Sequence, residues 1–331
     1  MRGPLQKKFS TDLNKSLLAT LIRYFPPIEF DETLIDIVNV LMDGLTRGDV
    51  YIDMKETPQN RDFIYEGWPS RHMKALIKSG WTQGDKSPIV LNGDLVSWRR
   101  THNEIAETIN KILVRNKPFV NLSKEIPVRI EAKNQENLNI QQLEAVNLVN
   151  RQRIILLSGG PGTGKTSTIL QMLMQAISRD PNLNIAMAAP TGKAAKKLKD
   201  TVQAGIENLQ DPLKNKLATI PSKTLHRWLE AGPNGFRRNS KRLLKLDLII
   251  IDEMSMVDLA TINGLLDALT KSCQIILVGD PNQLLPIGSS GIWQTLQEKE
   301  TKTNFQENSI KLTKSYRNKG DIALLRNTLE V

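Results

Sequence analysis

The chain has 331 residues, of which 40% are hydrophobic, enough to bury a sizeable core in two domains or in one large domain with an appendage. Its longest apolar runs, at residues 154–157 and 248–251, are far shorter than the roughly 20 residues of a membrane-spanning helix, which excludes a membrane protein. The basic N-terminus lacks the apolar core and cleavage site of a secretory signal. A single cysteine, Cys273, excludes an internal disulfide and indicates a reducing cytoplasm.

The net charge is strongly positive, because Lys and Arg outnumber Asp and Glu by 45 to 35, a surplus of +10. Such a surplus favours polyanionic partners, since cationic side chains neutralise phosphates and release counterions. Many basic proteins bind no nucleic acid, so charge alone leaves the class of partner open.

The region 1–116 is predicted to be a small, mostly helical domain with short extended pieces. Asp31 is suited to cap a helix that Gly48 ends. Asn92-Gly93 is a strong hairpin signal and predicts that residues 89–91 pair with residues 95–96. No catalytic constellation is recognisable in this region, so we expect it to dock another protein. One face of the predicted helix is apolar: Leu34, Ile37, Val38, Leu41 and Leu45.

Residues 117–137 are polar, have little periodicity and are predicted to be a linker. From residue 138 onward, buried apolar runs alternate with helical stretches, a pattern typical of parallel strands joined by crossover helices. The predicted fold class is therefore α/β, with a parallel sheet in a domain spanning 138–308. The expected strands are residues 153–158, 184–189, 246–252 and 274–279.

A glycine-rich segment follows the first of these strands and opens a helix. Its glycines allow backbone N–H groups to surround phosphate oxygens, and the helix N-terminus adds partial positive charge. Lys165 is expected to reach the β and γ phosphates of a nucleoside triphosphate, and Thr166 to bind Mg²⁺. A chance glycine-rich turn is disfavoured by the strand before and the helix after. The segment is Gly159, Gly160, Pro161, Gly162, Thr163, Gly164, Lys165 and Thr166.

Two adjacent carboxylates, Asp252 and Glu253, follow the apolar run at residues 248–251. Ligands bind at the carboxyl ends of such strands. Asp252 is expected to hold Mg²⁺, directly or through water, and Glu253 to orient and deprotonate the attacking water. An acidic pair alone more often caps a helix or lies in solvent, but a phosphate loop about 90 residues earlier favours the catalytic role.

A further strand ends at Gly279 and Asp280, close to Gln283. The Gln283 amide is placed to contact a γ phosphate. The segment Gly-Asp-Pro-Asn is also good turn chemistry, and the two roles are compatible.

Several segments occur in the order and approximate spacing of superfamily 1 helicases of the RecD-like branch, which residues 138–317 resemble strongly. The resemblance implies a RecA-like P-loop motor domain that binds and hydrolyses ATP with Mg²⁺ and travels 5′ to 3′ on DNA. It further implies that Gln142 reads the adenine base, and that Arg317 faces the γ phosphate from the start, at 309–331, of a truncated second motor domain. The segments are GGPGTGKT, APTGKAA, TLHR, IIDEMSM and GDPNQLLPIGSSG.

The same resemblance implies contacts with single-stranded DNA. Thr191 lies between a strand and a helix, where its hydroxyl and nearby N–H groups can bind a phosphate. The lysines beyond it are also typical of a solvated helix face, and His226 is equally compatible with the core. Trp228 is expected to pack rather than to stack on bases. The residues implied are Pro190, Thr191, Lys193, Thr224 and His226.

The N-terminal region more weakly resembles that of the RecD subunit of exodeoxyribonuclease V. This resemblance implies RecB-like and RecC-like partners and a cytoplasmic role in double-strand break repair and recombination. A stand-alone helicase and an ATP-binding remnant without unwinding activity stay open as alternatives. An RNA motor also stays open, because phosphate contacts do not separate RNA from DNA. A small-molecule kinase is disfavoured, since it has no use for APTGKAA or TLHR.

Overall fold

The computed structural model describes residues 11–56, 58, 65–119, 138–207, 209–281, 283, 292–297 and 303–316. Within them the chain forms two compact units, one up to Glu107 and one from Thr108 onward. Most of the expected linker, residues 120–137, lies outside the described residues, as do residues 317–331 and with them Arg317. No helix in the described parts of the chain has the length and apolar character needed to cross a membrane.

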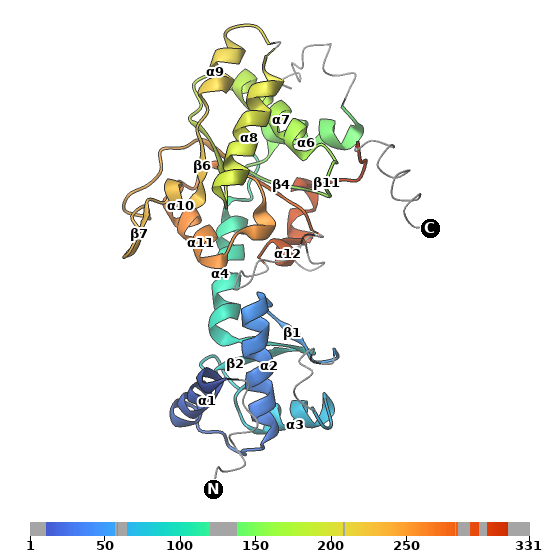
Figure 1. Cartoon of the computed structure of the whole chain (residues 1–331), viewed down its shortest axis with the longest axis vertical. Coiled ribbons are helices and arrows are strands. Elements are labelled where there is room, and N and C mark those ends of the chain that lie inside the picture. Colours follow the sequence, from blue (N-terminus) through green and yellow to red (C-terminus); the bar gives the residue numbers. More distant parts are fainter. Residues whose placement is uncertain are drawn as a thin grey trace, which may run out of the picture. The chain divides into compact units, whose positions relative to one another are not determined.

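The first unit combines helices with a three-stranded antiparallel sheet in the order β1-β3-β2 (Figure 1). Its core includes the fully buried Leu34, Leu76 and Trp81. Helix α4 (Arg99–Arg115) follows β3 and contains the boundary between the units. The other elements are α1 (Asp12–Tyr24), α2 (Thr33–Arg47), β1 (Ile52–Asp53), α3 (Ser70–Lys78), β2 (Ile89–Asn92) and β3 (Leu95–Trp98).

Local signals correctly predicted two features of this unit. Gly48 ends α2 with a left-handed φ of 89°. The hairpin is also confirmed, because β2 pairs with β3 in a register that sets Asn92 opposite Leu95. Asp31, the expected cap, is not the N-cap of α2: that residue is Glu32, which makes no side-chain capping hydrogen bond, although Asp31 accepts a hydrogen bond from the Thr33 N–H at 2.9 Å.

The second unit is built on a six-stranded parallel sheet in the order β11-β4-β10-β9-β5-β6. The expected α/β class is confirmed, and each of the expected strands forms within a residue or two of its predicted bounds. The strands are β4 (Ile154–Gly159), β5 (Ile185–Ala189), β6 (Ser222–Thr224), β9 (Leu248–Ile251), β10 (Gln274–Gly279) and β11 (Ser309–Leu312).

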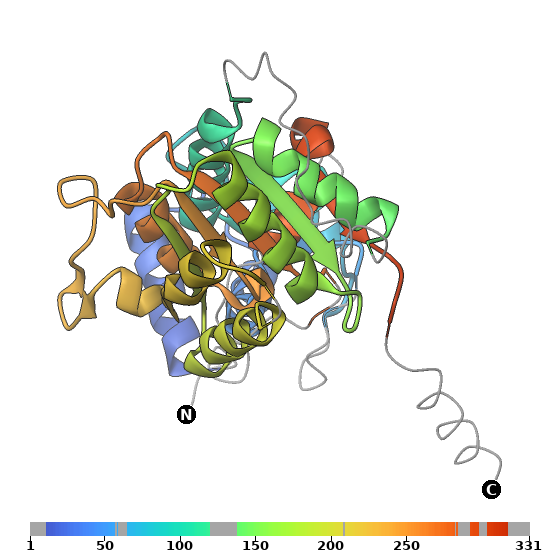
Figure 2. The ribbon, with the colours of Figure 1, turned by 90° about the horizontal axis from the view of Figure 1, so that it is seen from above.

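The central strands of this sheet are buried along their whole length, as expected for parallel strands covered on both faces. Alternate side chains such as Leu157, Met187 and Ile250 join one core with α6, α7, α8 and α9. Figure 2 shows the green helices α6 and α7 beside β4. Helices and short strands of this unit are α6 (Ile140–Arg151), α7 (Lys165–Arg179), α8 (Gly192–Gly205), α9 (Leu213–Thr219), α10 (Leu225–Trp228), β7 (Ala231–Gly232), β8 (Gly235–Phe236), η2 (Met254–Met256), α11 (Leu259–Ala268), α12 (Ile292–Gln297) and η3 (Thr303–Asn308).

Strand β11 corrects the expectation that a second motor domain begins at residue 309. Residues Ser309–Leu312 pair in parallel with β4, with Ile310 opposite Leu157, and so belong to the first sheet. Ile310 and Leu312 are 6% and 2% exposed, because the alternating pattern of this short strand turns both side chains into the core. The sheet therefore extends at least to Leu312.

Candidate nucleotide-binding site

The carboxyl ends of the parallel strands gather the expected nucleotide residues at one edge of the sheet. Strand β4 leads into the phosphate loop, β9 into Asp252, and β10 into Asp280. Because β10 lies between β4 and β9, these three ends are adjacent. A cavity of about 590 Å³ lies here. It is lined by the phosphate loop and by Lys197, Asp252, Glu253, Asp280, Gln283 and Tyr316.

The phosphate loop presents a cation and a helix N-terminus at this cavity. Lys165 is the first residue of α7, and its ammonium donates hydrogen bonds to the carbonyl oxygens of Gly159 at 2.5 Å and Gly160 at 3.1 Å. Gly164 has a left-handed φ of 84°, and a Cβ there would lie 2.7 Å from Nε2 of Gln142. Only glycine fits this position, so the loop conformation that suits an anion depends on it.

Asp252 is a largely desolvated carboxyl at the end of β9. Its pKa is raised to about 6, mainly by burial and in part by the charge of Glu253, against the lowering effects of the Glu253 backbone N–H, Lys165 and Lys197. The Glu253 N–H donates to Oδ1 of Asp252 at 2.9 Å. A carboxylate that burial disfavours at neutral pH gains strongly from a bound cation. Its chemistry therefore fits Mg²⁺, with the hydroxyl of Thr166 in the same cavity as a further ligand.

Glu253 has a backbone strain that the sequence did not reveal. Its φ of 56° and ψ of 44° are left-handed, a conformation that a non-glycine residue seldom adopts. Strain of this kind is often kept at functional sites, where the surrounding structure holds it in place. Here it turns the chain from β9 into η2 and leaves Glu253 in the lining of the cavity.

Tyr316 is a cavity residue that sequence reasoning missed. Its backbone N–H donates to the Gly162 carbonyl at 2.8 Å, and its hydroxyl accepts a hydrogen bond from Nδ2 of Asn139 at 2.9 Å. The only sequence signal was its position directly before Arg317. Gln142, the expected base-reading residue, is 3% exposed, and its Oε1 accepts from the Asn139 N–H at 3.0 Å in a capping box of α6. Gln142 thus lies beside the loop but is not among the residues that line the cavity.

The expected DNA-contacting residues occupy the neighbouring part of the same edge. Strands β5 and β6 pair in parallel, with Ala189 opposite Thr224, so Thr191 lies just beyond the end of β5 and Thr224 at the adjacent end of β6. Thr191 caps α8 by accepting from the Ala194 N–H at 3.2 Å, and Thr224 caps α10 by accepting from the Arg227 N–H at 3.2 Å. Pro190 precedes Thr191 directly. Two helix N-termini therefore begin side by side, a favourable arrangement for anionic groups.

The structure bears on three side chains near these caps and resolves the alternatives for one of them, His226. His226 is exposed and touches Phe236 edge to face, with ring centroids 6.0 Å apart, so it is not a core histidine. Trp228 packs as expected, because its indole N–H donates to the Met187 carbonyl at 3.0 Å. Lys193 is exposed on the first turn of α8. Lys197, one turn further along the helix, lines the nucleotide cavity and was not expected there.

Fold and loop together define a P-loop nucleotide-binding domain of the RecA-like type. Residues 142–289 match the family model described as an AAA domain. The chain is 37% identical over 166 residues to the RecBCD enzyme subunit RecD of Mycolicibacterium smegmatis, covering 48% of this chain and 30% of that one. It is 33% identical over 234 residues to the RecBCD enzyme subunit RecD of Buchnera aphidicola, and the match covers 68% of this chain and 38% of that one.

A third relative is the ATP-dependent RecD2 DNA helicase of Deinococcus radiodurans, 32% identical over 158 residues, with 48% of this chain and 20% of that one covered. The chain is thus similar to RecD-like superfamily 1 helicases over the matched residues. It spans 20–38% of the length of these three relatives.

Proposed function

We propose that the second unit is an ATP-dependent DNA motor domain, in which Mg²⁺-ATP binds in the cavity and single-stranded DNA binds along the ends of β5 and β6. The observation that carries this proposal is the strand order. Strand β9, which leads into Asp252, lies between β10 and β5, so nucleotide and DNA residues share one continuous edge. A change at the nucleotide then has a short, well-packed path to the DNA.

The cavity residues supply the groups that phosphoryl transfer needs. Lys165 neutralises the β and γ phosphates, while Thr166 and Asp252 hold Mg²⁺, which when bound offsets charge on the phosphate oxygens. Glu253 orients the attacking water and accepts its proton. Gln283 contacts the γ phosphate through its amide. Arg317, outside the described residues, is proposed to face the same phosphate because it corresponds to the family's arginine at that position.

Binding measurements test the nucleotide half of the proposal. Lys165→Ala is expected to weaken Mg²⁺-ATP binding by calorimetry at least tenfold, since a charged hydrogen bond contributes about 1.5–3 kcal/mol. Lys271→Ala is the matched control, because Lys271 is exposed and precedes β10 at the opposite edge of the sheet. Equal affinities of the unsubstituted chain and Lys165→Ala would overturn the assignment.

Coupling between ATP and DNA separates a motor from a remnant that only binds nucleotide. In a motor, a non-hydrolysable ATP analogue changes the affinity for a single-stranded oligonucleotide, and DNA changes the affinity for the analogue by the same factor. A coupling factor of one would favour the remnant. Oligonucleotides of DNA and RNA compared at the same length and salt would decide which nucleic acid is preferred.

We further propose that the first unit docks RecB-like and RecC-like subunits, since two of the relatives are RecBCD subunits by name. Large apolar side chains are exposed along the segment from α1 to α2 and on α3. We call these five residues the apolar surface. They are Tyr24 (67% exposed), Phe25 (38%), Ile28 (79%), Phe30 (45%) and Ile77 (47%). Exposed apolar side chains that gather in this way are typical of protein interfaces.

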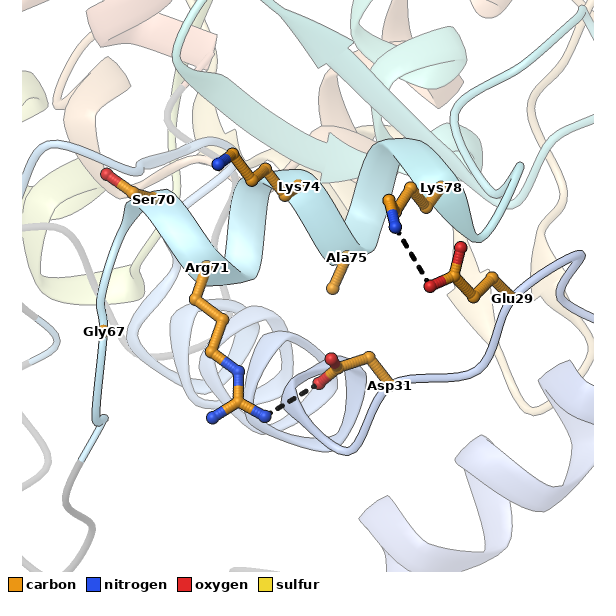
Figure 3. Close-up of a pocket in the computed structure, with 8 residues that line it drawn as sticks. All are labelled: Glu29, Asp31, Gly67, Ser70, Arg71, Lys74, Ala75 and Lys78. Carbon is orange, nitrogen blue, oxygen red and sulfur yellow. Dashed lines mark hydrogen bonds and ion pairs between the residues drawn. The ribbon is translucent and has the colours of Figure 1, made fainter.

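A cavity of about 490 Å³ in the first unit is lined largely by charged side chains (Figure 3). Lys78 pairs with Glu29 at 3.1 Å, and Arg71 pairs with Asp31 at 3.6 Å. Both pairs are exposed and contribute little to stability. Glu29 and Asp31 flank Phe30 in sequence, and Lys78 follows Ile77, so a polar rim adjoins the apolar residues, as in protein interfaces generally.

A further inference from the structure

We propose that Ser255 fixes the orientation of the Gln283 amide and thereby lets the site discriminate ATP from ADP. This inference rests on the proposed nucleotide-binding function. Ser255 does not line the cavity; it is a positioning residue that acts through Gln283.

Ser255 has a buried hydroxyl and lies in the short turn that follows Asp252 and Glu253. It lies in η2, two residues after Glu253, and is 1% exposed. Its hydroxyl donates a hydrogen bond of 2.5 Å to Oε1 of Gln283. Gln283 is exposed to the cavity and follows β10, the strand next to β9. One hydrogen bond therefore connects the segments that follow two neighbouring strands.

The direction of this hydrogen bond decides what Gln283 offers to a ligand. A carboxamide has an accepting oxygen on one side and a donating NH₂ on the other. When Ser255 holds the oxygen, the NH₂ group is left to donate into the cavity. The reverse orientation would turn the oxygen toward phosphates and toward the carboxylates of Asp252 and Asp280. A hydroxyl can also accept, so it is the carboxylates that disfavour the reverse orientation and select the one in which Ser255 donates. In this orientation the Gln283 NH₂ group can donate to a γ phosphate, which ADP lacks.

The position of Ser255 also links its hydrogen bond with Gln283 to the catalytic residue Glu253. It shares the short turn after β9 with Glu253, whose left-handed backbone fixes where that turn begins. A γ phosphate that draws on the Gln283 NH₂ also strengthens the Ser255 hydrogen bond on its far side, since linked hydrogen bonds polarise one another. When the γ phosphate is lost, the bond from the Gln283 NH₂ group is lost and the Ser255–Gln283 hydrogen bond weakens.

A double-mutant cycle on the full chain tests the proposal. We would measure by calorimetry the affinities for Mg²⁺-ADP and a non-hydrolysable Mg²⁺-ATP analogue in the unsubstituted chain, Ser255→Ala, Gln283→Ala and the double variant. Gln283→Ala is expected to lower analogue affinity about 10-fold, because it removes a hydrogen bond to a charged group. Ser255→Ala should lower it about 3- to 10-fold, and the double variant should match Gln283→Ala. Affinity for ADP should change less than about 2-fold throughout.

Three further variants separate positioning from general loss of structure. Ser255→Thr keeps the hydroxyl and should restore the preference for the ATP analogue. Thr261→Val removes another buried hydroxyl of this unit, one that donates to Asp258 at 2.7 Å, and should leave the preference unchanged. Gln283→Glu still accepts from Ser255 but has no N–H to donate, so it should lose the preference at least as fully as Gln283→Ala. A retained preference in Gln283→Glu would overturn the proposal even if Ser255→Ala did not fold.

The cycle also separates this inference from the proposed function. Additive losses in the double variant, or an equal loss of ADP and ATP-analogue affinity in a Ser255→Ala protein that melts normally, would overturn the role of Ser255 alone. Failure of the unsubstituted chain to bind either nucleotide would overturn the nucleotide-binding function, and the role of Ser255 with it.

Discussion

Tyr316 and Gly162 are joined by a backbone hydrogen bond of 2.8 Å, which ties the segment after β11 to the phosphate loop. The Tyr316 hydroxyl reaches in the other direction, to Asn139 at the start of α6. Residues far apart in the sequence thus converge beside the phosphate loop. Gln142, the expected base-reading residue, is close to the same tyrosine, since the Tyr316 hydroxyl lies 3.4 Å from its Oε1.

Removal of the Tyr316 ring is expected to weaken binding of ATP and ADP alike. An aromatic contact contributes about 0.5–1.5 kcal/mol beyond its buried area, so Tyr316→Ala should lower both affinities about 5- to 20-fold in calorimetric titrations. Tyr316→Phe keeps the ring and loses only the hydroxyl contacts, and should stay within about 3-fold of the unsubstituted chain. Unchanged affinities in Tyr316→Ala would show that the ring does not contact the nucleotide.

The raised pKa of Asp252 predicts a pH-dependent cost to folding. In the unfolded chain the carboxyl has its ordinary pKa of 3.8, and in the folded chain about 6. The folded state therefore holds the proton more tightly, and the free energy of unfolding falls as pH rises from about 4 to 6. Above pH 6 the Asp252 carboxyl is ionised in both states. Its burial then lowers the free energy of unfolding by the full amount, at most about 3 kcal/mol.

Asp252→Asn removes this cost, and its amide oxygen can still accept the Glu253 N–H. Urea unfolding without Mg²⁺ should show the variant about 1–3 kcal/mol more stable than the unsubstituted chain at pH 8 and equally stable near pH 4. Asp200→Asn, which alters an exposed carboxyl on α8, should change stability by less than about 0.5 kcal/mol at either pH. A stability gain in Asp252→Asn that does not depend on pH would contradict the proposed cause.

Local signals made much of this site predictable. Gly159, Gly164 and Lys165 form the phosphate loop in a strand-to-helix context that short-range rules describe, and buried apolar runs revealed the central strands. Contacts between distant segments were not predictable in this way. Strand β11 is short, and only its pairing with β4 shows that it belongs to this sheet. The strain of Glu253 and the Ser255–Gln283 hydrogen bond depend on how neighbouring strand ends pack together.

Charge reversal at Lys193 tests the proposed DNA edge. If Lys193 neutralises a phosphate, Lys193→Glu should weaken binding of single-stranded DNA and reduce the slope of log affinity against log salt by about 1. The loss should not depend on base sequence, because the proposed contacts are to the backbone. Lys271→Glu makes the same charge change at the opposite edge of the sheet and should leave the salt slope unaltered. If Lys193→Glu and Lys271→Glu showed the same slope of log affinity against log salt, the DNA would not bind at this edge of the sheet.

The two threonine caps offer an independent test of the same edge. Thr191→Ala and Thr224→Ala each remove a hydroxyl that caps a helix at adjacent strand ends, and should cost about 1 kcal/mol of stability. Thr191→Ser keeps the hydroxyl and should bind DNA normally. If Thr191→Ala lowers stability while DNA affinity stays the same at equal salt, the hydroxyl serves only to cap α8.

The apolar surface of the first unit should govern assembly without affecting the nucleotide site. Ile28 is 79% exposed, so Ile28→Asp costs little folding stability, about 0.5 kcal/mol or less, yet would bury a charge in any interface formed over it. We expect it to lower co-purification with a co-expressed RecC-like subunit at least tenfold, while calorimetry finds ATP affinity unchanged, because the cavity lies in the second unit. Leu243→Asp places the same charge at a 39% exposed leucine of the second unit and should leave co-purification intact. If Ile28→Asp and Tyr24→Asp both recovered the partner fully, docking would use another surface. If Leu243→Asp also lost co-purification of the partner, the cause would be a general effect of added charge.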